Sequence, residues 1–373
     1  MFLKSMNFLF KKKSYKTFNL IVIGSFFIVS IIFTGLLNIF FPIVFQNKIE
    51  IQNYHNSLYG NSETGCSTLE YIDPEVLFIG DSSGYHSWDF DLFAKKTQKK
   101  VGSCFLQGFS ILSIEHLLNF LQKKNLKPEF LILSNTYRIF LNKKINEGFA
   151  SDHKKYLSDI IDSKFQKRFQ ILSKYLRGKK LLKVTIPLNQ DINVYLDNIE
   201  INKVNLLVEN IILKNKETSG FKNYESLKKK FYDQNFYFET HENYLNLLCN
   251  YISKNKINLV LTKVPTSIQV KNLVNKKQNE NDLKVIEYLE KCTTNKLYSN
   301  TNPDDFKINN KYFILSNNNE NDYLKLKEYM NEFNDKNYVT SFFDFTHMNR
   351  YGSQKFTNAW LKKNNFIFKI ENK

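Results

Sequence analysis

Two short segments near opposite ends of the chain carry the residue types that can activate a serine. Gly80-Asp81-Ser82-Ser83-Gly84 follows a short apolar run, and Asp344-Phe345-Thr346-His347 places an acid and a base three residues apart. A serine hydroxyl is a weak nucleophile at neutral pH, so it needs a neutral imidazole to accept its proton and a carboxylate to orient that imidazole. We therefore predict Ser82 as a nucleophile, His347 as its general base and Asp344 as the residue that orients the base.

Together the two segments resemble the SGNH/GDSL family of serine esterases and acyltransferases. The family's first block is Gly-Asp-Ser and its last is Asp-x-x-His, which match Gly80-Asp81-Ser82 and Asp344–His347. The continuation to Gly352, His-Met-Asn-Arg-Tyr-Gly, is similar to the tail of membrane-anchored members. The resemblance covers about residues 75–135 and 255–363. It implies an α/β fold with three layers, α/β/α, and a mainly parallel sheet of the SGNH or flavodoxin-like kind.

The same resemblance implies an oxyanion hole. Its donors would be the backbone N–H groups of Ser82 and Gly108 and the side-chain amide of Asn135. The family's third block is Gly-x-Asn-Asp, whereas this chain has Leu133-Ser134-Asn135-Thr136. A differently built oxyanion hole, and a simple turn role for Gly108, therefore stay open.

Other residues compete for these roles. Ser83 is a second hydroxyl, but the Gly-Asp-Ser register favours Ser82. Among the alternative bases, His116 is expected on the flank of a helix, and His86 is expected at the surface of the serine loop, with substrate contact as its alternative. The segment 80–84 also matches the Gly-x-Ser-x-Gly elbow of α/β-hydrolases. Too few residues precede it for that fold, in which the acid and the histidine lie on separate loops.

The elements that must position these groups can be predicted from apolar runs and periodicity. Runs that end at turn residues predict strands over Val76–Ile79, Val101–Leu106, Phe130–Leu133, Ile257–Thr262 and Tyr338–Phe343. A repeat of 3.6 residues predicts a helix over Ile114–Leu121, with Ser113 as its N-cap. Strands that alternate with helices favour a parallel sheet, whose carboxyl ends would bring the candidate residues to one rim.

Two long regions lack a strand signal. Residues 141–240 are Lys-rich with intermittent helical patterns, such as Tyr156–Leu176 and Val204–Lys214, and predict a helical insertion. This insertion could be a substrate-facing lid or purely structural. Residues 270–335 are also predicted to be mainly helical, and a closing helix is expected around Asn358–Leu361.

The N-terminus predicts a membrane anchor. Residues 17–47 contain no charged side chain, and the residues before them carry five lysines and no acid. About 20 apolar residues cross a bilayer, and basic flanks stay in the cytoplasm. The apolar region exceeds the ~7–15 residues of a cleaved signal peptide. We expect a cytoplasmic segment 1–17, a transmembrane helix 18–45, a connector 46–74 and an outward-facing domain 75–373, held at the plasma (inner) membrane by this single pass.

Charge and cysteine content exclude some functions. The net charge is +17, but only four of the 53 basic residues are Arg and the lysines are scattered. This pattern favours a solvated basic surface over a nucleic-acid site. The four cysteines have no C-x-x-C spacing, which argues against a zinc or thioredoxin-like site. Pairs Cys66–Cys104 and Cys249–Cys292 could form outside the cytoplasm, with buried thiols equally open. We expect no cofactor or metal.

The functional expectation from the resemblance is an esterase or O-acyltransferase that acts on acyl esters of a cell-envelope glycan. Its partners would be the membrane, an acylated glycan or acyl donor and, for transfer, a membrane protein that carries acyl groups. Hydrolysis and transfer share one acyl-enzyme step, so both stay open. A non-catalytic SGNH-like subunit that binds or assembles envelope polysaccharide is the alternative. A nucleic-acid-binding protein would instead need a cytoplasmic domain.

Overall fold

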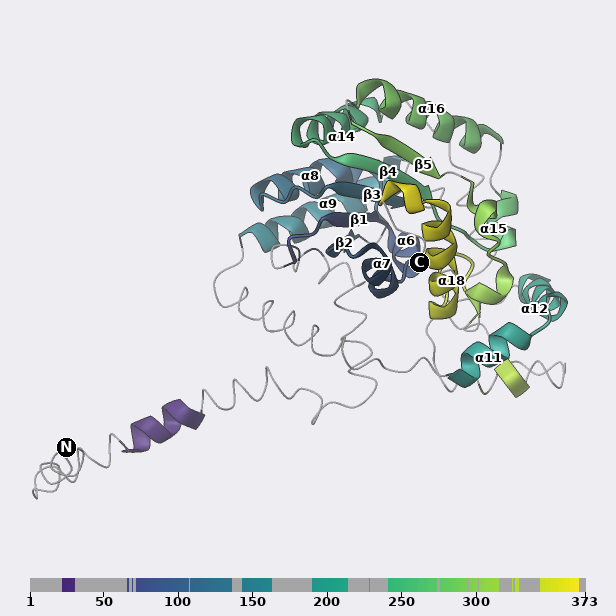
Figure 1. The fold of residues 1–373 in the computed structure, drawn as a ribbon. Coiled ribbons are helices and arrows are strands. Elements are labelled where there is room, and N and C mark those ends of the chain that lie inside the picture. Colours follow the sequence, from purple (N-terminus) through teal and green to yellow (C-terminus); the bar gives the residue numbers. More distant parts are fainter. Residues whose placement is uncertain are drawn as a thin grey trace, which may run out of the picture. The chain divides into compact units, whose positions relative to one another are not determined.

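A parallel sheet of five strands forms the centre of the fold in the computed structural model of the protein (Figure 1). The strand order is β2-β1-β3-β4-β5, the flavodoxin-like order of doubly wound sheets. The strands are β1 Val76–Gly80, β2 Val101–Phe105, β3 Phe130–Asn135, β4 Asn258–Lys263 and β5 Leu297–Asn300. The structure describes residues 22–30, 66, 69, 72–106, 108–135, 143–162, 190–213, 228, 241–273, 276–293, 295–300, 302–314, 324, 326–328 and 343–368.

Apolar side chains cover both faces of this sheet. On β1, Val76 and Phe78 belong to one buried cluster, and Leu77 and Ile79 belong to the other. Successive side chains of a strand point to opposite faces, so a strand buried on both faces is apolar at every position. The continuous run Val-Leu-Phe-Ile follows from this position at the centre of the sheet.

Helices pack on each face, so the domain has three layers. The helices whose buried residues join Leu77 and Ile79 are α8 Ile114–Lys123, α9 Lys143–Ile161, α14 Glu242–Asn255 and α16 Lys276–Cys292. Those whose buried residues join Val76 and Phe78 are α7 Phe90–Thr97, α11 Gln190–Asn198, α12 Ile201–Leu213, α15 Ile268–Leu273 and α18 Arg350–Lys363. The described residues also form the short helix α6 Ser82–His86 and the 3₁₀ turns η1 Ile111–Ser113, η3 Pro303–Phe306, η4 Asn310–Phe313 and η5 Asn365–Ile367.

The α/β prediction with a mainly parallel sheet is confirmed, and four of the predicted strands match β1 to β4 to within two residues at each end. The strand β5 lies in a region predicted to be mainly helical, so that prediction is wrong there. Its four residues are mostly half-exposed, and such a short edge strand gives no apolar run. The predicted strand Tyr338–Phe343 lies outside the described residues except for Phe343, which forms an antiparallel bridge with Ile314.

The described parts of the predicted insertion 141–240 are the helices α9, α11 and α12, the residues 162, 199 and 200 next to them, and residue 228. The three helices agree with the helical prediction. Helix α9 packs on α8 and η1 and buries Leu157 and Ile160 in the core (Figure 1). This helix is therefore part of the layer that covers the sheet. The predicted N-cap Ser113 does precede α8, but its hydroxyl does not cap the helix and instead lies 2.8 Å from Nδ1 of His153.

The expected transmembrane helix 18–45 falls mostly outside the described residues, as does the basic segment 1–17. Residues 22–30 are described; they are helical and belong to a unit separate from the sheet. Most of their apolar side chains, including Phe26 and Phe27, are exposed. Within the described part of the chain, no helix is both long and apolar enough to cross a bilayer.

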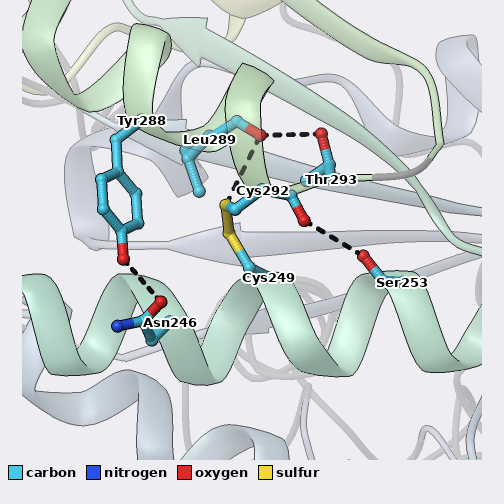
Figure 2. The surroundings of a disulfide bond; sticks show 7 residues. All are labelled: Asn246, Cys249, Ser253, Tyr288, Leu289, Cys292 and Thr293. Carbon is cyan, nitrogen blue, oxygen red and sulfur yellow. Dashed lines mark hydrogen bonds between the residues drawn. A yellow bond between two sulfur atoms is a disulfide. The ribbon is translucent and has the colours of Figure 1, made fainter.

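Of the two alternatives left open for the cysteines, the structure has the disulfides, with Cα–Cα distances of 4.4 Å for Cys66–Cys104 and 5.8 Å for Cys249–Cys292. The second disulfide joins α14 to the end of α16 (Figure 2). Cys66 and Leu69 lie within the expected connector 46–74, yet both are fully buried in the core of the domain. The end of this segment is therefore packed against the sheet.

We expect reduction of the two disulfides to destabilise the domain. They close loops of 38 and 43 residues, and a loop of this length is worth about 4 kcal/mol through the entropy of the unfolded chain. Urea unfolding with and without dithiothreitol measures this difference, and replacement of Cys249 and Cys292 by serine isolates the second bond. Free thiols in the folded, oxidised protein would contradict the pairing.

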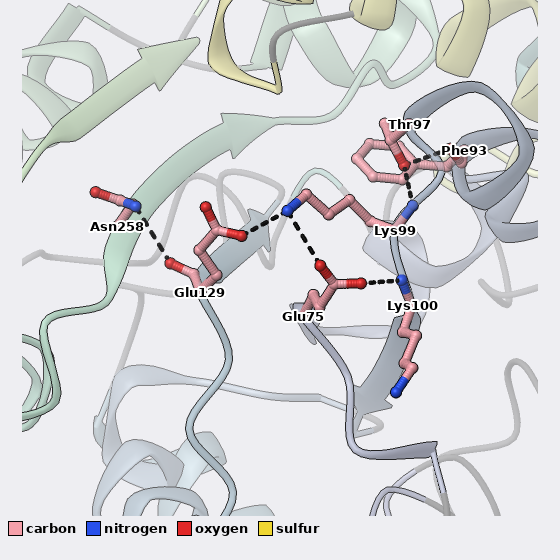
Figure 3. Close-up of polar contacts among 7 residues, drawn as sticks. All are labelled: Glu75, Phe93, Thr97, Lys99, Lys100, Glu129 and Asn258. Atoms are coloured by element: carbon pink, nitrogen blue, oxygen red, sulfur yellow. Dashed lines mark hydrogen bonds and ion pairs between the residues drawn. The ribbon is translucent and has the colours of Figure 1, made fainter.

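Polar residues join the amino ends of β1, β2 and β3 (Figure 3). The candidate residues follow the opposite, carboxyl ends of these strands. The Lys99 ammonium lies 3.1 Å from Glu75 and 2.6 Å from Glu129, and these three residues stand just before β2, β1 and β3. The backbone N–H of Lys100 and the Lys99 side chain hold the pKa of Glu75 below its ordinary value. This network aligns the strands whose other ends carry the candidate residues.

Candidate active site

Ser82 is the second residue after β1 and the first residue of α6, and it is half-buried. The sequence predicted a loop here. The segment is instead a five-residue helix because Asp81 caps it: the Asp81 carboxylate accepts a hydrogen bond of 2.9 Å from the backbone N–H of Gly84. In this chain, Asp81 of the Gly-Asp-Ser block is therefore a buried helix cap that fixes where α6 begins.

The turn that carries Ser82 packs directly on the end of β3. Gly80 has φ +155°, and a Cβ on it would lie 1.9 Å from the carbonyl oxygen of Ser134. A Cβ on Gly84 would lie 2.6 Å from the same oxygen. Ser134 is also held from its other side, because the Trp88 indole N–H donates to its hydroxyl at 2.7 Å. Both glycines of Gly-Asp-Ser-Ser-Gly are therefore needed for close packing.

Asp344 and His347 lie beside Ser82, although they are more than 260 residues away in the sequence. Nε2 of His347 lies 2.9 Å from the Ser82 hydroxyl oxygen, and Nδ1 lies 2.8 Å from Oδ2 of Asp344. The two contacts connect the Ser82 hydroxyl, the His347 imidazole and the Asp344 carboxylate in one continuous hydrogen-bonded chain. With Nδ1 protonated toward Asp344, Nε2 is free to accept the serine proton.

Asp344 is buried, and its second oxygen is also occupied. Oδ1 accepts backbone N–H bonds from Thr346 at 2.9 Å and from His347 at 3.0 Å. Burial alone would raise the pKa of Asp344, but His347 and these N–H groups outweigh burial and hold the pKa below its ordinary value. The carboxyl group is thus ionised at neutral pH, as an orienting group must be.

The residues after His347 anchor its loop. The Asn349 side chain accepts from the Gly352 N–H at 2.7 Å, which caps α18, and donates to the carbonyl of Ile314 at 2.7 Å. A Cβ on Gly352 would approach Tyr312 to 2.8 Å. The Asn and Gly of the C-terminal tail therefore fix the histidine loop against η4, a structural role that the motif alone did not indicate.

The three expected oxyanion donors lie on neighbouring strands. Ser82 follows β1, Gly108 follows β2 and Asn135 ends β3, so the parallel pairing brings their backbones to one edge of the sheet. Gly108 has φ +65°, and a Cβ on it would lie 2.8 Å from the Phe149 ring. This backbone conformation favours glycine. The side chain of Asn135 lies outside the described part of the structure.

The structure also shows where the alternative candidates for nucleophile and base lie. The Ser83 side chain is buried, with 1% of its surface exposed, so it is not the accessible hydroxyl. His116 is half-buried on α8, and burial lowers its pKa. His86 was expected at the surface, but its ring is half-buried and packs on His347, with ring centroids 4.7 Å apart. The spacing of four residues between Ser82 and His86, one turn of a helix, points to this neighbourhood only once α6 is known to be helical.

No cluster of three or more His, Cys, Asp or Glu residues suited to a metal ion occurs among the described residues. Comparison with known proteins found no family model, curated protein or solved structure that matches this chain. The chemistry of the site therefore has to be argued from its geometry.

Proposed function

We propose that this chain is a membrane-anchored, extracytoplasmic SGNH-like serine esterase or O-acyltransferase that acts on acyl esters of a cell-envelope glycan. The observation that supports the enzyme proposal is the hydrogen-bonded path from Ser82 through His347 to Asp344. Ser82 and His347 are both half-buried, so both residues are held by packing while part of each stays exposed to solvent.

In the proposed reaction, the Ser82 oxygen attacks the ester carbonyl carbon while Nε2 of His347 takes the hydroxyl proton. The tetrahedral intermediate then expels the alcohol, and His347 returns the proton to the leaving oxygen. Water or a sugar hydroxyl next attacks the acyl group on Ser82, again with His347 as base, which frees the enzyme. The N–H groups of Ser82 and Gly108 would stabilise the oxyanion, an effect worth about 2.7–4 kcal/mol for each donor.

The extracytoplasmic part of the proposal has separate support. The uncharged segment 17–47 follows a basic N-terminus, and the domain has two disulfides, which persist mainly outside the cytoplasm. Alkylation of the protein in cells quenched with acid tests this part, because thiols that react before reduction would place the domain in the cytoplasm. In this setting an acylated glycan is the proposed substrate, and a membrane protein that carries acyl groups is the proposed donor for transfer.

A non-catalytic binding or assembly subunit is the second candidate. The segment Leu133-Ser134-Asn135-Thr136 departs from the family's third block, and the Ser134 hydroxyl in it is occupied by Trp88. Such a subunit would keep the fold and the envelope location but would not form an acyl-enzyme.

Labelling with a fluorophosphonate separates these candidates. We expect wild type to be labelled on Ser82 and Ser82→Ala to show no label, because the probe reacts with an activated serine hydroxyl. The neighbouring Ser83→Ala variant is the matched control and should be labelled within about threefold of wild type, since its hydroxyl is buried. A folded wild-type protein without Ser82-dependent label would favour the binding subunit. Mass spectrometry of the labelled peptide identifies the residue.

A further inference from the structure

His86 is a second imidazole within the candidate site. It lies one helical turn after Ser82, so both side chains are on the same face of α6. The His347 ring contacts both of them: Nε2 is 2.9 Å from the Ser82 oxygen, and the His86 ring centroid is 4.7 Å away with the planes tilted by 53°. The Tyr85 ring contacts His86 edge-on at 4.9 Å. The position of His86 is thus fixed by the residues that flank the nucleophile.

The sheet order defines two sides of the site. Gly108 follows β2, on one side of β1. The His347 loop is tied to the other side, because the N–H of Ser267, just after β4, donates to the Phe345 carbonyl at 3.0 Å. In an acyl transfer the oxyanion faces the backbone donors, and the leaving alcohol faces the histidine that protonates it. His86 packs on that histidine and therefore borders the alcohol part of an ester.

The His86 ring can form hydrogen bonds with the alcohol part of an ester. Neither of its ring nitrogens has a hydrogen-bond partner in the described part of the chain, although the side chain is half-buried. Burial, and to a smaller extent the neighbouring His347, lowers the pKa of His86 to about 3. Its ring is therefore neutral at neutral pH. A neutral imidazole has one N–H donor and one acceptor nitrogen. Polyols such as sugars present hydroxyl groups that match both.

We propose that His86 is a specificity-determining residue, which hydrogen-bonds a hydroxyl next to the reacting oxygen on the alcohol part of the substrate and so selects polyol esters. This inference rests on the proposed esterase or transferase function. It predicts that the contribution of His86 depends on the alcohol and not on the acyl group.

Two acetyl esters that differ only in the alcohol test this inference: glucose 6-acetate, a polyol ester, and 4-nitrophenyl acetate, which has no hydroxyl to bind. His86→Phe keeps an aromatic ring against His347 and removes both nitrogens. We expect its kcat/KM for glucose 6-acetate to fall about 10-fold, mainly through KM. Any loss of kcat/KM for 4-nitrophenyl acetate should be smaller, so that the ratio of the two kcat/KM values falls about threefold or more relative to wild type, and Ser82 should still be labelled by fluorophosphonate. His86→Gln restores a donor and an acceptor and should recover part of the loss, and His116→Phe is the matched histidine control.

Three results would overturn the inference. An equal loss on both esters would make His86 a packing partner that positions His347, and no loss on either would exclude substrate contact. A wild-type protein that cleaves the aryl ester but ignores the sugar ester would also exclude it. Failure of the proposed function is distinguishable from all three, because the wild type would then show no Ser82-dependent labelling.

Discussion

Replacing Asp344 with asparagine is expected to lower kcat/KM for ester hydrolysis about 10⁴-fold while the domain stays folded. The carboxylate accepts from Nδ1 of His347 at 2.8 Å and from two backbone N–H groups. Asparagine keeps the size and one acceptor oxygen for the backbone, but its NH₂ group would face Nδ1. The histidine would then carry its proton on Nε2, where it cannot accept the proton of Ser82.

The experiment compares kcat/KM for 4-nitrophenyl acetate with the free energy of unfolding for the same variants. His347→Gln should lose about 10⁴- to 10⁶-fold in kcat, and the double variant should lose little more, because the three residues act as one unit. A matched control is His116→Phe, which leaves the site intact. If Asp344→Asn retained activity within tenfold of wild type, Asp344 would only shape its loop.

The central strands could be predicted because the apolar pattern of their sequence matches the way in which they are packed. A strand covered on both faces is apolar throughout, so β1 and β3 stood out as uninterrupted runs. The strand β5 had no such pattern, since it is short and lies at the edge. The placement of Ser82 followed directly from β1, because this proposed nucleophile is the second residue after the strand.

The contact between Ser82 and His347 could not be derived from local patterns. It joins residues 265 positions apart, and only the match to two family blocks indicated it. The contact of His86 with His347 was missed because α6, at five residues, is too short to show periodicity. The buried roles of Asp81 and Asn349 were missed for a similar reason: a side chain that caps a helix becomes visible only when the helix boundary is known.

Gly80→Ala is expected to destabilise the domain by more than about 4 kcal/mol, a loss that few single substitutions cause. Its Cβ would lie 1.9 Å from the Ser134 carbonyl oxygen, and the obstacle is backbone in a central strand. Gly80 also has φ +155°, a conformation that residues with a Cβ rarely adopt. Neither the strand nor the residue can relax without breaking the pairing of β1 with β3.

Gly84→Ala is the matched variant, because its Cβ would approach the same oxygen to 2.6 Å from within α6, where the backbone is helical. We expect Gly84→Ala to lower the free energy of unfolding by about 1–3 kcal/mol, because a small shift of α6 away from β3 would relieve the clash with the Ser134 carbonyl oxygen. That shift carries Ser82 with it, so the folded Gly84→Ala protein should be labelled by fluorophosphonate more slowly than wild type. Urea unfolding of both variants measures the difference in stability. Equal stabilities would mean that the turn before Ser82 adapts as easily as the helix after it. Close packing on Ser134 would then not be what holds Ser82 in place.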